Sequence, residues 1–478
     1  MKLLRYLGIL ILAVFVAVTI FLLILVNFVN PNDFRGKISD AISQKIHKPF
    51  LIAGNINWVF FPSLGFKVQN TSLGTKNTPD LYAQINDLEI NLDIWPLLHK
   101  SVVLNALHLN GVDVVLPAKK DSDLKESKNN DTQSNPASAL GALSQFSLAE
   151  FSLDHATITQ NNIDHKMLWQ LKDLKLSSKH LGANHFFPIT LETNFLDKEK
   201  KLEGTLKFVT DMNVDPDKQN IILKKPELKI EFAPRSKITG TLALNSKEIS
   251  LDHLQEILKI NALKGTFNQF SFNTEAKITQ FYTNPVAVGD FQLNTEDLKA
   301  GLHNLSIDLP ATQANVFKQF SLQSHFQYSN NMLQLNPLKL SLDNQLLQGE
   351  MSSSDLSNQA LALNLNIPVF NVGNYLAPAP EATPIVMHQA QLNFRCLPPI
   401  AADKDWLASI MKGIFTINQL EIKNQKINNV NVQWQAKDKI INFTQLHLEA
   451  WQGALDATAG LNLQSDIHQI STNFNLKN

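Results

Sequence analysis

The residues with the clearest capacity for chemistry lie in the stretch DMNVDPDKQN, residues 211–220. Oxygen-bearing side chains recur there at alternate positions, as they do at the start of a calcium-binding loop: Asp211, Asn213, Asp215 and Asp217. The sharp turn of such a loop needs a glycine, but Pro216 stands at that position. Ile222 occupies the place of the bidentate glutamate. We therefore expect a polar hairpin loop here and no metal site.

Motifs of catalysis are absent from the sequence, which has no Gly-x-Ser-x-Gly, Walker loop, Gly-x-Gly-x-x-Gly or His-Glu-x-x-His. The 13 histidines are scattered, and the pairs His155/His165 and His180/His185 are expected to be surface or hairpin residues and not metal ligands. A single cysteine, Cys396, excludes an internal disulfide. We predict that the chain is not an enzyme and binds no cofactor. Its 42 basic and 43 acidic residues give a net charge of −1, so nucleic acid is not an expected partner.

The N-terminal segment, residues 1–30, carries no charge after Arg5, and the uncharged run ends only at Asp33. A helix of this length crosses the roughly 30 Å of bilayer hydrocarbon. A cleaved signal peptide is the alternative, but its apolar region normally ends in small residues, and this one continues through VNFVN. We predict a retained transmembrane helix with a cytoplasmic tip, which places the rest of the chain outside the cytoplasm.

Residues 31–49 predict a short amphipathic helix, with Asn32 or Asp33 as its N-cap and Pro49 as its stop. Apolar residues at helical spacing form one face: Phe34, Ile38, Ala41, Ile42 and Ile46. This face could contact lipid headgroups, or it could pack against the structure that follows. Packing is the simpler expectation.

From residue 51 the apolar residues alternate with polar ones, as in half-buried antiparallel strands, and roughly 20 to 25 strands are expected. Helices are expected only at 250–260 and, more weakly, at 403–414. The predicted fold is mostly β. The apolar positions of the clearest alternating rows are Leu88, Ile90, Leu92, Ile94, Leu202, Leu206, Phe208, Ile238, Leu242, Leu244, Leu361, Leu363, Leu365, Val430, Val432 and Trp434.

Two polar or proline-rich stretches divide the predicted sheet. Residues 118–139 are poor in apolar side chains and are expected to be disordered, and residues 376–386 read as a proline-stiffened spacer. The β segments are then 50–117, 140–375 and 387–478. Within them 332–352 and 440–460 share one scheme of strand, turn, glycine and strand. Such a repeated unit must stack on its neighbours, which predicts an elongated body.

The apolar face of these strands needs a cover, because burying each Leu, Ile, Val or Phe is worth roughly 1.5–3 kcal/mol. The sequence supplies too few helices for this. A closed sandwich would provide a second sheet, whereas a curled sheet would form a groove open to an apolar ligand. The aromatic residues Trp58, Phe60 and Phe61 could anchor such a body at a lipid interface, although packing in the core is the simpler expectation for each.

The order of features at the N-terminus resembles the AsmA family. The apolar span and the helix FRGKISDAISQKIHKPF are followed by AGNINWVFFPSLGFKVQNTSLG, with Gly54 and Trp58, then Pro62, Leu64 and Gly65, then a Ser-Leu-Gly strand end. The closing stretch from GIFTINQLEI to LNLQ is similar to the family's C-terminal unit, with Trp451-Gln452-Gly453 where members carry an aromatic-Gly-Gly step.

This resemblance implies a single-pass protein of the Gram-negative inner membrane with a large periplasmic part, related to bridge-like lipid transfer proteins. It implies an elongated, curled antiparallel sheet, or β-groove, that binds or conducts phospholipids and supports outer-membrane biogenesis. The alternative is a periplasmic scaffold that regulates outer-membrane protein assembly and carries no lipid. The implied partners are phospholipid, the inner membrane and envelope proteins.

Overall fold

The computed structural model describes residues 30–46, 48–60, 63–74, 82–93, 104–116, 147–162, 166–305, 307–309, 315–356, 360–375, 410–422, 425–437, 440–462 and 469–477. Several predictions fall outside this part of the chain: the transmembrane span before residue 30, the loop 118–139, the spacer 376–386, Ile94 and Phe61. Among the described residues no helix has the length and apolar character needed to cross a membrane.

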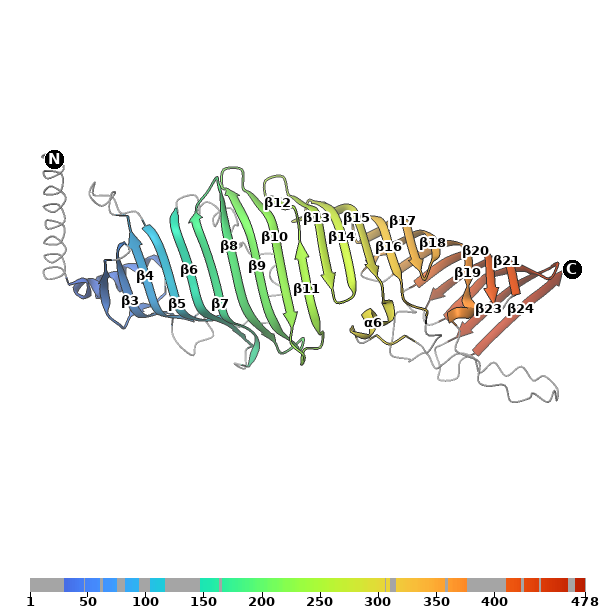
Figure 1. Ribbon diagram of the computed structural model, residues 1–478, viewed down its shortest axis with the longest axis horizontal. Coiled ribbons are helices and arrows are strands. Elements are labelled where there is room, and N and C mark those ends of the chain that lie inside the picture. The colour runs from blue at the N-terminus through green and yellow to red at the C-terminus, as the bar shows by residue number, and fades with distance from the viewer. Residues whose placement is uncertain are drawn as a thin grey trace, which may run out of the picture. The chain divides into compact units, whose positions relative to one another are not determined.

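The predicted mostly-β fold is confirmed, with 24 strands in one hydrogen-bonded sheet (Figure 1). The strands are β1 (Phe50–Ile52), β2 (Ile56–Val59), β3 (Leu64–Leu73), β4 (Tyr82–Leu92), β5 (Leu104–Leu116), β6 (Leu148–Asn161), β7 (Met167–Leu181), β8 (Phe186–Asp197), β9 (Leu202–Asp215), β10 (Asn220–Phe232), β11 (Gly240–Asn245), β12 (Glu248–Asp252), β13 (Ile257–Phe267), β14 (Phe270–Thr279), β15 (Val286–Thr295), β16 (Phe320–Ser329), β17 (Met332–Leu342), β18 (Gln345–Asp355), β19 (Ala360–Asn371), β20 (Ile410–Ile422), β21 (Gln425–Lys437), β22 (Ile440–Ala450), β23 (Gly453–Asn462) and β24 (Gln469–Lys477).

The described helices are short: η1 (Pro31–Phe34), α2 (Arg35–Ile46), α6 (Leu298–His303) and η3 (Val372–Tyr375). The helix expected over 31–49 is confirmed, although its N-cap is Asn30, whose side chain accepts a hydrogen bond from the Asn32 amide.

The prediction of a helix over 250–260 is wrong. The chain instead forms a hairpin in which Ile249 and Leu251 of β12 lie opposite Ile260 and Leu258 of β13. Leu251, Leu254, Ile257 and Leu258 have helical spacing along the chain, but they lie in and beside a tight turn. The pairing of β12 and β13 within the sheet favours the hairpin over the helix. The second expected helix, 403–414, also fails in its described part, because residues 410–414 begin β20.

Most neighbouring strands are antiparallel, as expected, but β5–β6 and β19–β20 are parallel. A parallel pair cannot be joined by a hairpin and needs a connection of about a dozen residues or more. The two long stretches that the sequence marks as loop and spacer lie in the connections between these strands. They therefore mark the two places where the next strand runs in the same direction as the one before it.

The chain divides into two compact units: unit 1 contains residues 1–223 and 227–237, and unit 2 contains residues 224–226 and 238–478. In unit 1, β1 and β2 both pair with β3, and β3 to β9 then follow in chain order. In unit 2, β11 and β12 both pair with β13, and β13 to β24 follow in chain order. The repeat seen in the sequence is the hairpin β17–β18 and the hairpin β22–β23.

Residues with positive φ angles recur in four strands of unit 1. Asn70 of β3, Gly111 of β5, His155 of β6 and Asp173 of β7 all have φ angles between 47° and 66°. The register shifts beside His155 and Asp173, so β6 and β7 each carry a bulge with an extra residue there. Because of that extra residue, the apolar side chains on both sides of the bulge point to the same face of the sheet.

Candidate functional site

One face of the unit 1 sheet carries a continuous row of apolar side chains. Each member lies directly opposite the next on the neighbouring strand, from β2 to β9, without interruption. The row is Ile56, Val68, Leu88, Leu109, Leu153, Leu176, Leu191 and Phe208. Cross-strand neighbours of this kind are about 5 Å apart, so their side chains touch. The row is therefore an unbroken apolar track across eight strands.

A second row widens this face. This second row lies on β2 to β6, and its first two members are aromatic. It consists of Trp58, Phe66, Ile90, Leu107 and Phe151. The rings of Trp58 and Phe66 have centroids 4.4 Å apart, and Trp58 also stacks on Phe60 at 6.1 Å. The membrane-proximal aromatic residues predicted from the sequence thus belong in part to the apolar face, while Phe60 remains 38% exposed.

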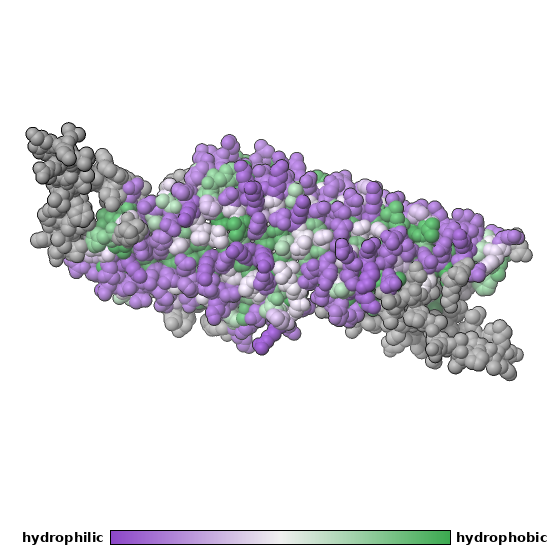
Figure 2. All heavy atoms as spheres, in the orientation of Figure 1, coloured by the Kyte–Doolittle hydropathy of each residue, from purple (hydrophilic) through white to green (hydrophobic). Residues whose placement is uncertain are grey.

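The apolar face is incompletely buried. Ile56 and Val68 are 3% and 8% exposed, but most other members of the two rows lie in the intermediate range between buried and exposed. Figure 2 shows apolar residues between bordering hydrophilic residues over the strands β6 to β10. A face enclosed between two sheets would be buried throughout. This face has room for further apolar contact.

The opposite face of unit 1 is charged. Lys175, Glu192 and Lys207 lie opposite one another on β7, β8 and β9, and Lys207 Nζ is 2.6 Å from Glu192 Oε1. The hydrogen bond from Lys207, followed by its positive charge, lowers the pKa of the Glu192 carboxyl. These side chains are about half exposed. The sheet therefore has one face suited to water and one suited to hydrocarbon.

Unit 2 carries two long, mostly apolar rows of its own. The first runs from β12 to β23 and consists of Ile249, Ile260, Ala276, Gly289, Phe326, Leu335, Met351, Leu363, Gly413, Trp434, Phe443 and Ala459. The second runs from β15 to β24 and consists of Phe291, Ser324, Leu338, Gly349, Leu365, Phe415, Val432, Leu446, Ala457 and Phe474. Ser324 is the one hydroxyl-bearing residue in these two rows. Its hydroxyl donates to the Pro337 carbonyl at 2.9 Å.

Glycines in these rows make room for aromatic rings. A Cβ atom built on Gly413 would collide with the indole of Trp434, and one on Gly289 would collide with the ring of Phe326. Each ring therefore lies over a glycine of the neighbouring strand and flat along the face. Around Leu335, Leu338 and Leu365, which are buried, this packing gives unit 2 a small core.

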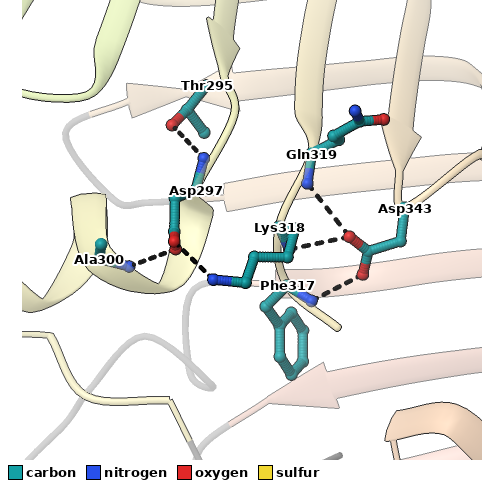
Figure 3. Close-up of polar contacts among 7 residues, drawn as sticks. All are labelled: Thr295, Asp297, Ala300, Phe317, Lys318, Gln319 and Asp343. Atoms are coloured by element: carbon teal, nitrogen blue, oxygen red, sulfur yellow. Dashed lines mark hydrogen bonds and ion pairs between the residues drawn. The ribbon is translucent and has the colours of Figure 1, made fainter. Parts of the chain in front are cut away.

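A polar network fixes one margin of unit 2 (Figure 3). The Asp297 carboxylate caps α6 by accepting a hydrogen bond from the Ala300 amide at 2.9 Å, and it accepts a second from Lys318 Nζ at 2.6 Å. The lysine bond, followed by the capping bond, lowers the pKa of Asp297. Gly301 of α6 lies against the ring of Phe270, which is 9% exposed. The network thus holds α6 over one end of the apolar face.

Asp343, in the turn between β17 and β18, is the second acid of this network. Its carboxylate accepts hydrogen bonds from the backbone amides of Phe317, Lys318 and Gln319 at 2.6, 2.8 and 3.1 Å. Tyr375 of η3 donates its hydroxyl to the same carboxylate at 3.0 Å. Burial, followed by this contact with Asp343, raises the pKa of Tyr375 to about 12. We call Asp297, Lys318, Asp343 and Tyr375 the margin cluster.

The predicted row residues with described positions are distributed over five strands and one bend. Leu88, Ile90 and Leu92 lie on β4; Leu202, Leu206 and Phe208 on β9; Leu242 and Leu244 on β11; Leu361, Leu363 and Leu365 on β19; Val430, Val432 and Trp434 on β21; Ile238 lies in the bend before β11. On at least one adjacent strand, most of them have an apolar residue or glycine opposite: Leu88, Ile90, Leu92, Phe208, Leu242, Leu244, Leu361, Leu363, Leu365, Val430, Val432 and Trp434. Leu202 and Leu206 instead lie opposite Asp197 and Thr193 of β8. Contact with lipid at these positions stays a prediction.

Several members of the rows escaped the sequence analysis. Leu153 and Leu176 lie beside bulges, where strict alternation breaks, and Gly413 and Gly289 are not apolar by type. His155 and Asp173 have positive φ angles, and their residue types are enriched there, but residue type alone does not distinguish these positions from the many other His and Asp residues of the chain. The margin cluster was also missed, since its members come from separate turns and helices.

The stretch resembling a calcium loop is a strand end and a turn. Asp211 and Asn213 lie in β9, and Asp215 ends it. The Asp215 carboxylate accepts hydrogen bonds from the backbone amide of Lys218 at 3.0 Å and from its Nζ at 2.9 Å. The hydrogen bond from the Lys218 side chain is the main reason that the pKa of Asp215 is lowered. Both carboxylate oxygens of Asp215 thus accept hydrogen bonds within the hairpin.

The fold and the rows define a class of protein. Each unit is a sheet of mostly antiparallel strands with a partly exposed apolar face, and in unit 1 the opposite face carries exposed charges. The comparison with family models agrees with this description. The model of the AsmA family matches residues 1–379, and the chain belongs to the AsmA family. No curated protein matches the chain, and no solved structure matches it.

Proposed function

We propose that the protein binds or conducts phospholipids along its apolar face, with acyl chains on the apolar rows and headgroups in water. The observation that carries this proposal is the uninterrupted apolar track, partly exposed, on a sheet whose other face is charged. Hydrocarbon that covers such a track gains roughly 25 cal/mol for each Å² removed from water. The continuity of the track allows a chain to move along it without crossing a polar barrier.

The proposed location follows from the family and the sequence. We propose that the predicted span at residues 1–30 anchors the protein in the inner membrane, that the sheet lies in the periplasm and that the protein supports envelope biogenesis. No residue is proposed to act as an acid, base or nucleophile. The sheet would act only by offering lipid an apolar surface.

Native mass spectrometry of the detergent-extracted full chain tests this function. We expect bound phospholipid in a defined ratio, removed by Leu206→Asp or Leu363→Asp and retained in Thr205→Asp and Asn364→Asp. The control residues are exposed neighbours in the same strands whose side chains point to the other face. A folded wild-type chain that carries no phospholipid would instead support the scaffold that regulates assembly of outer-membrane proteins.

A further inference from the structure

The helical segment η1–α2 binds the open edge of the sheet through polar side chains. Asn32 makes two hydrogen bonds with the backbone of Ile56: its Nδ2 donates to the carbonyl at 3.1 Å, and its Oδ1 accepts from the amide at 2.9 Å. Arg35 donates to the carbonyl of Gly54 at 3.2 Å. Side chains of the helix thus take the place of a neighbouring strand at β2.

The next two turns of the helix do the same for β1. The Ser39 hydroxyl accepts a hydrogen bond from the Ile52 amide at 3.3 Å, and the Ser43 hydroxyl accepts one from the Phe50 amide at 2.8 Å. Ser39 is only 8% exposed. Arg35, Ser39 and Ser43 are four residues apart and form one polar stripe. This stripe protects the edge of the sheet from pairing with other strands.

With the polar stripe on the sheet, Phe34 and Ile38 point away from the sheet. Phe34 is 48% exposed and Ile38 is 39% exposed. At about 100° per residue, Phe34 and Ile38 share one side of the helix, about 100–140° away from the centre of the polar stripe. For these two residues the packing expected from the sequence is wrong. A surface helix usually turns its apolar side chains toward the protein, but Phe34 and Ile38 face outward.

The sequence identifies what can cover these side chains. The uncharged run from Tyr6 to Asn32 is long enough to cross a bilayer, and it leads directly into η1, which begins at Pro31. Whatever emerges from the membrane at that point stays at its surface. Lys37, which is exposed, lies to the side of the apolar pair and can remain in the headgroup region.

We propose that η1–α2 lies in the interface of the bilayer, with Phe34 and Ile38 between headgroups and acyl chains and with the stripe Arg35, Ser39 and Ser43 on the sheet. The helix would then fix the first strands, β1 and β2, directly at the membrane surface. The inference rests on the predicted span and does not depend on lipid movement along the sheet.

Site-specific fluorescence on the full chain in phospholipid nanodiscs tests the proposal. In a Cys396→Ser background, single cysteines at Phe34, Ile38, Lys37 and Leu254 are labelled with NBD. Leu254, which is 63% exposed, lies in the turn between β12 and β13. It serves as an exposed apolar control from unit 2. Lys37 controls for mere proximity to the anchor.

We expect labels at Phe34 and Ile38 to emit at shorter wavelength and to be quenched strongly by nitroxide-bearing lipids, the label at Lys37 weakly, and the label at Leu254 not at all. Before labelling, the cysteines at 34 and 38 should react slowly with a water-soluble maleimide. Equal quenching and equal reactivity at positions 34, 37 and 38 would overturn the proposal. Adding Leu206→Asp separates the two hypotheses, because loss of lipid from the sheet should leave quenching at Phe34 unchanged.

Discussion

Units 1 and 2 build their apolar faces in different ways. In unit 1 the longest row consists of aliphatic residues on seven strands and ends in Phe208. In unit 2 large rings alternate with glycines, as at Phe326 beside Gly289 and Trp434 beside Gly413. Many equivalent contacts hold the first row, whereas the second depends on particular pairs of residues.

The difference extends to the polar parts of the two units. Unit 1 carries exposed ion pairs such as Lys207–Glu192, which contribute little to stability. Unit 2 has the margin cluster, in which one carboxylate satisfies three backbone amides. Single substitutions should therefore lower the stability of unit 2 more than that of unit 1. A charge on the apolar face should affect both units.

The largest effect is expected from charges placed on the face itself. Leu206→Asp in unit 1 and Leu363→Asp in unit 2 put an unpaired carboxylate on the apolar face, where hydrocarbon cannot solvate it. Lipid transfer between donor and acceptor vesicles should be abolished in both, provided that circular dichroism shows a folded sheet. Unchanged transfer in both folded variants would show that lipid does not move along the apolar face of either unit.

Filling a glycine position comes next. In Gly413→Leu the new side chain occupies the space of the Trp434 ring and displaces it. This overpacking should lower the free energy of unfolding by about 1–3 kcal/mol. Urea unfolding followed by tryptophan fluorescence measures this change. The double variant Gly413→Leu with Trp434→Ala should recover part of the loss, because the ring no longer competes for the space. No recovery would mean that the ring and the glycine are not coupled.

The margin cluster gives the third test. Asp343→Ala leaves the amides of Phe317, Lys318 and Gln319 without their acceptor and should destabilise unit 2 by about 1–3 kcal/mol. Hydrogen exchange at these amides should accelerate. The matched surface change Lys207→Ala in unit 1 should leave its exchange pattern unaltered, and equal effects in the two units would contradict the comparison.

Tyr375 predicts a pH dependence at the alkaline end. Its folded pKa is raised from 10.0 to about 12, so the neutral phenol stabilises the folded state fully below pH 10. This contribution is lost as the pH rises from 10 toward 12, because the unfolded chain ionises first. The difference in phenolate absorbance between wild type and Tyr375→Phe should titrate near pH 12. A midpoint near 10 would show that Tyr375 is not held by Asp343.

The smallest effect is expected in the turn between β22 and β23, where Trp451 and Gln452 have φ angles of 52° and 67°. Such angles suit glycine and strain other residues. Gln452→Gly should therefore stabilise unit 2 by about 1 kcal/mol, seen as a higher urea midpoint. A lower midpoint would show that the Gln452 side chain makes a contact that outweighs the strain.

The sequence was sufficient for the features that repeat. Alternation along β4, β9, β19 and β21 identified their apolar faces, and the helix at 31–49 followed from spacing alone. Residues 250–260 failed because Leu251 and Leu258 are paired across two strands, which spacing along the chain cannot reveal. The bulges at His155 and Asp173 and the margin cluster depend on contacts between distant segments, so no local pattern predicts them.

The account depends most on lipid touching one face of the sheet and not the other. A photo-crosslinking amino acid placed at Phe208 and Leu363 reads the apolar face, and the same amino acid at Lys207 and Asn364, their neighbours in sequence, reads the charged face. In cells supplied with radiolabelled phospholipid precursors, we predict labelled adducts at the first two positions and none at the other two. Equal labelling on both faces, or none at Phe208 and Leu363, would contradict the account.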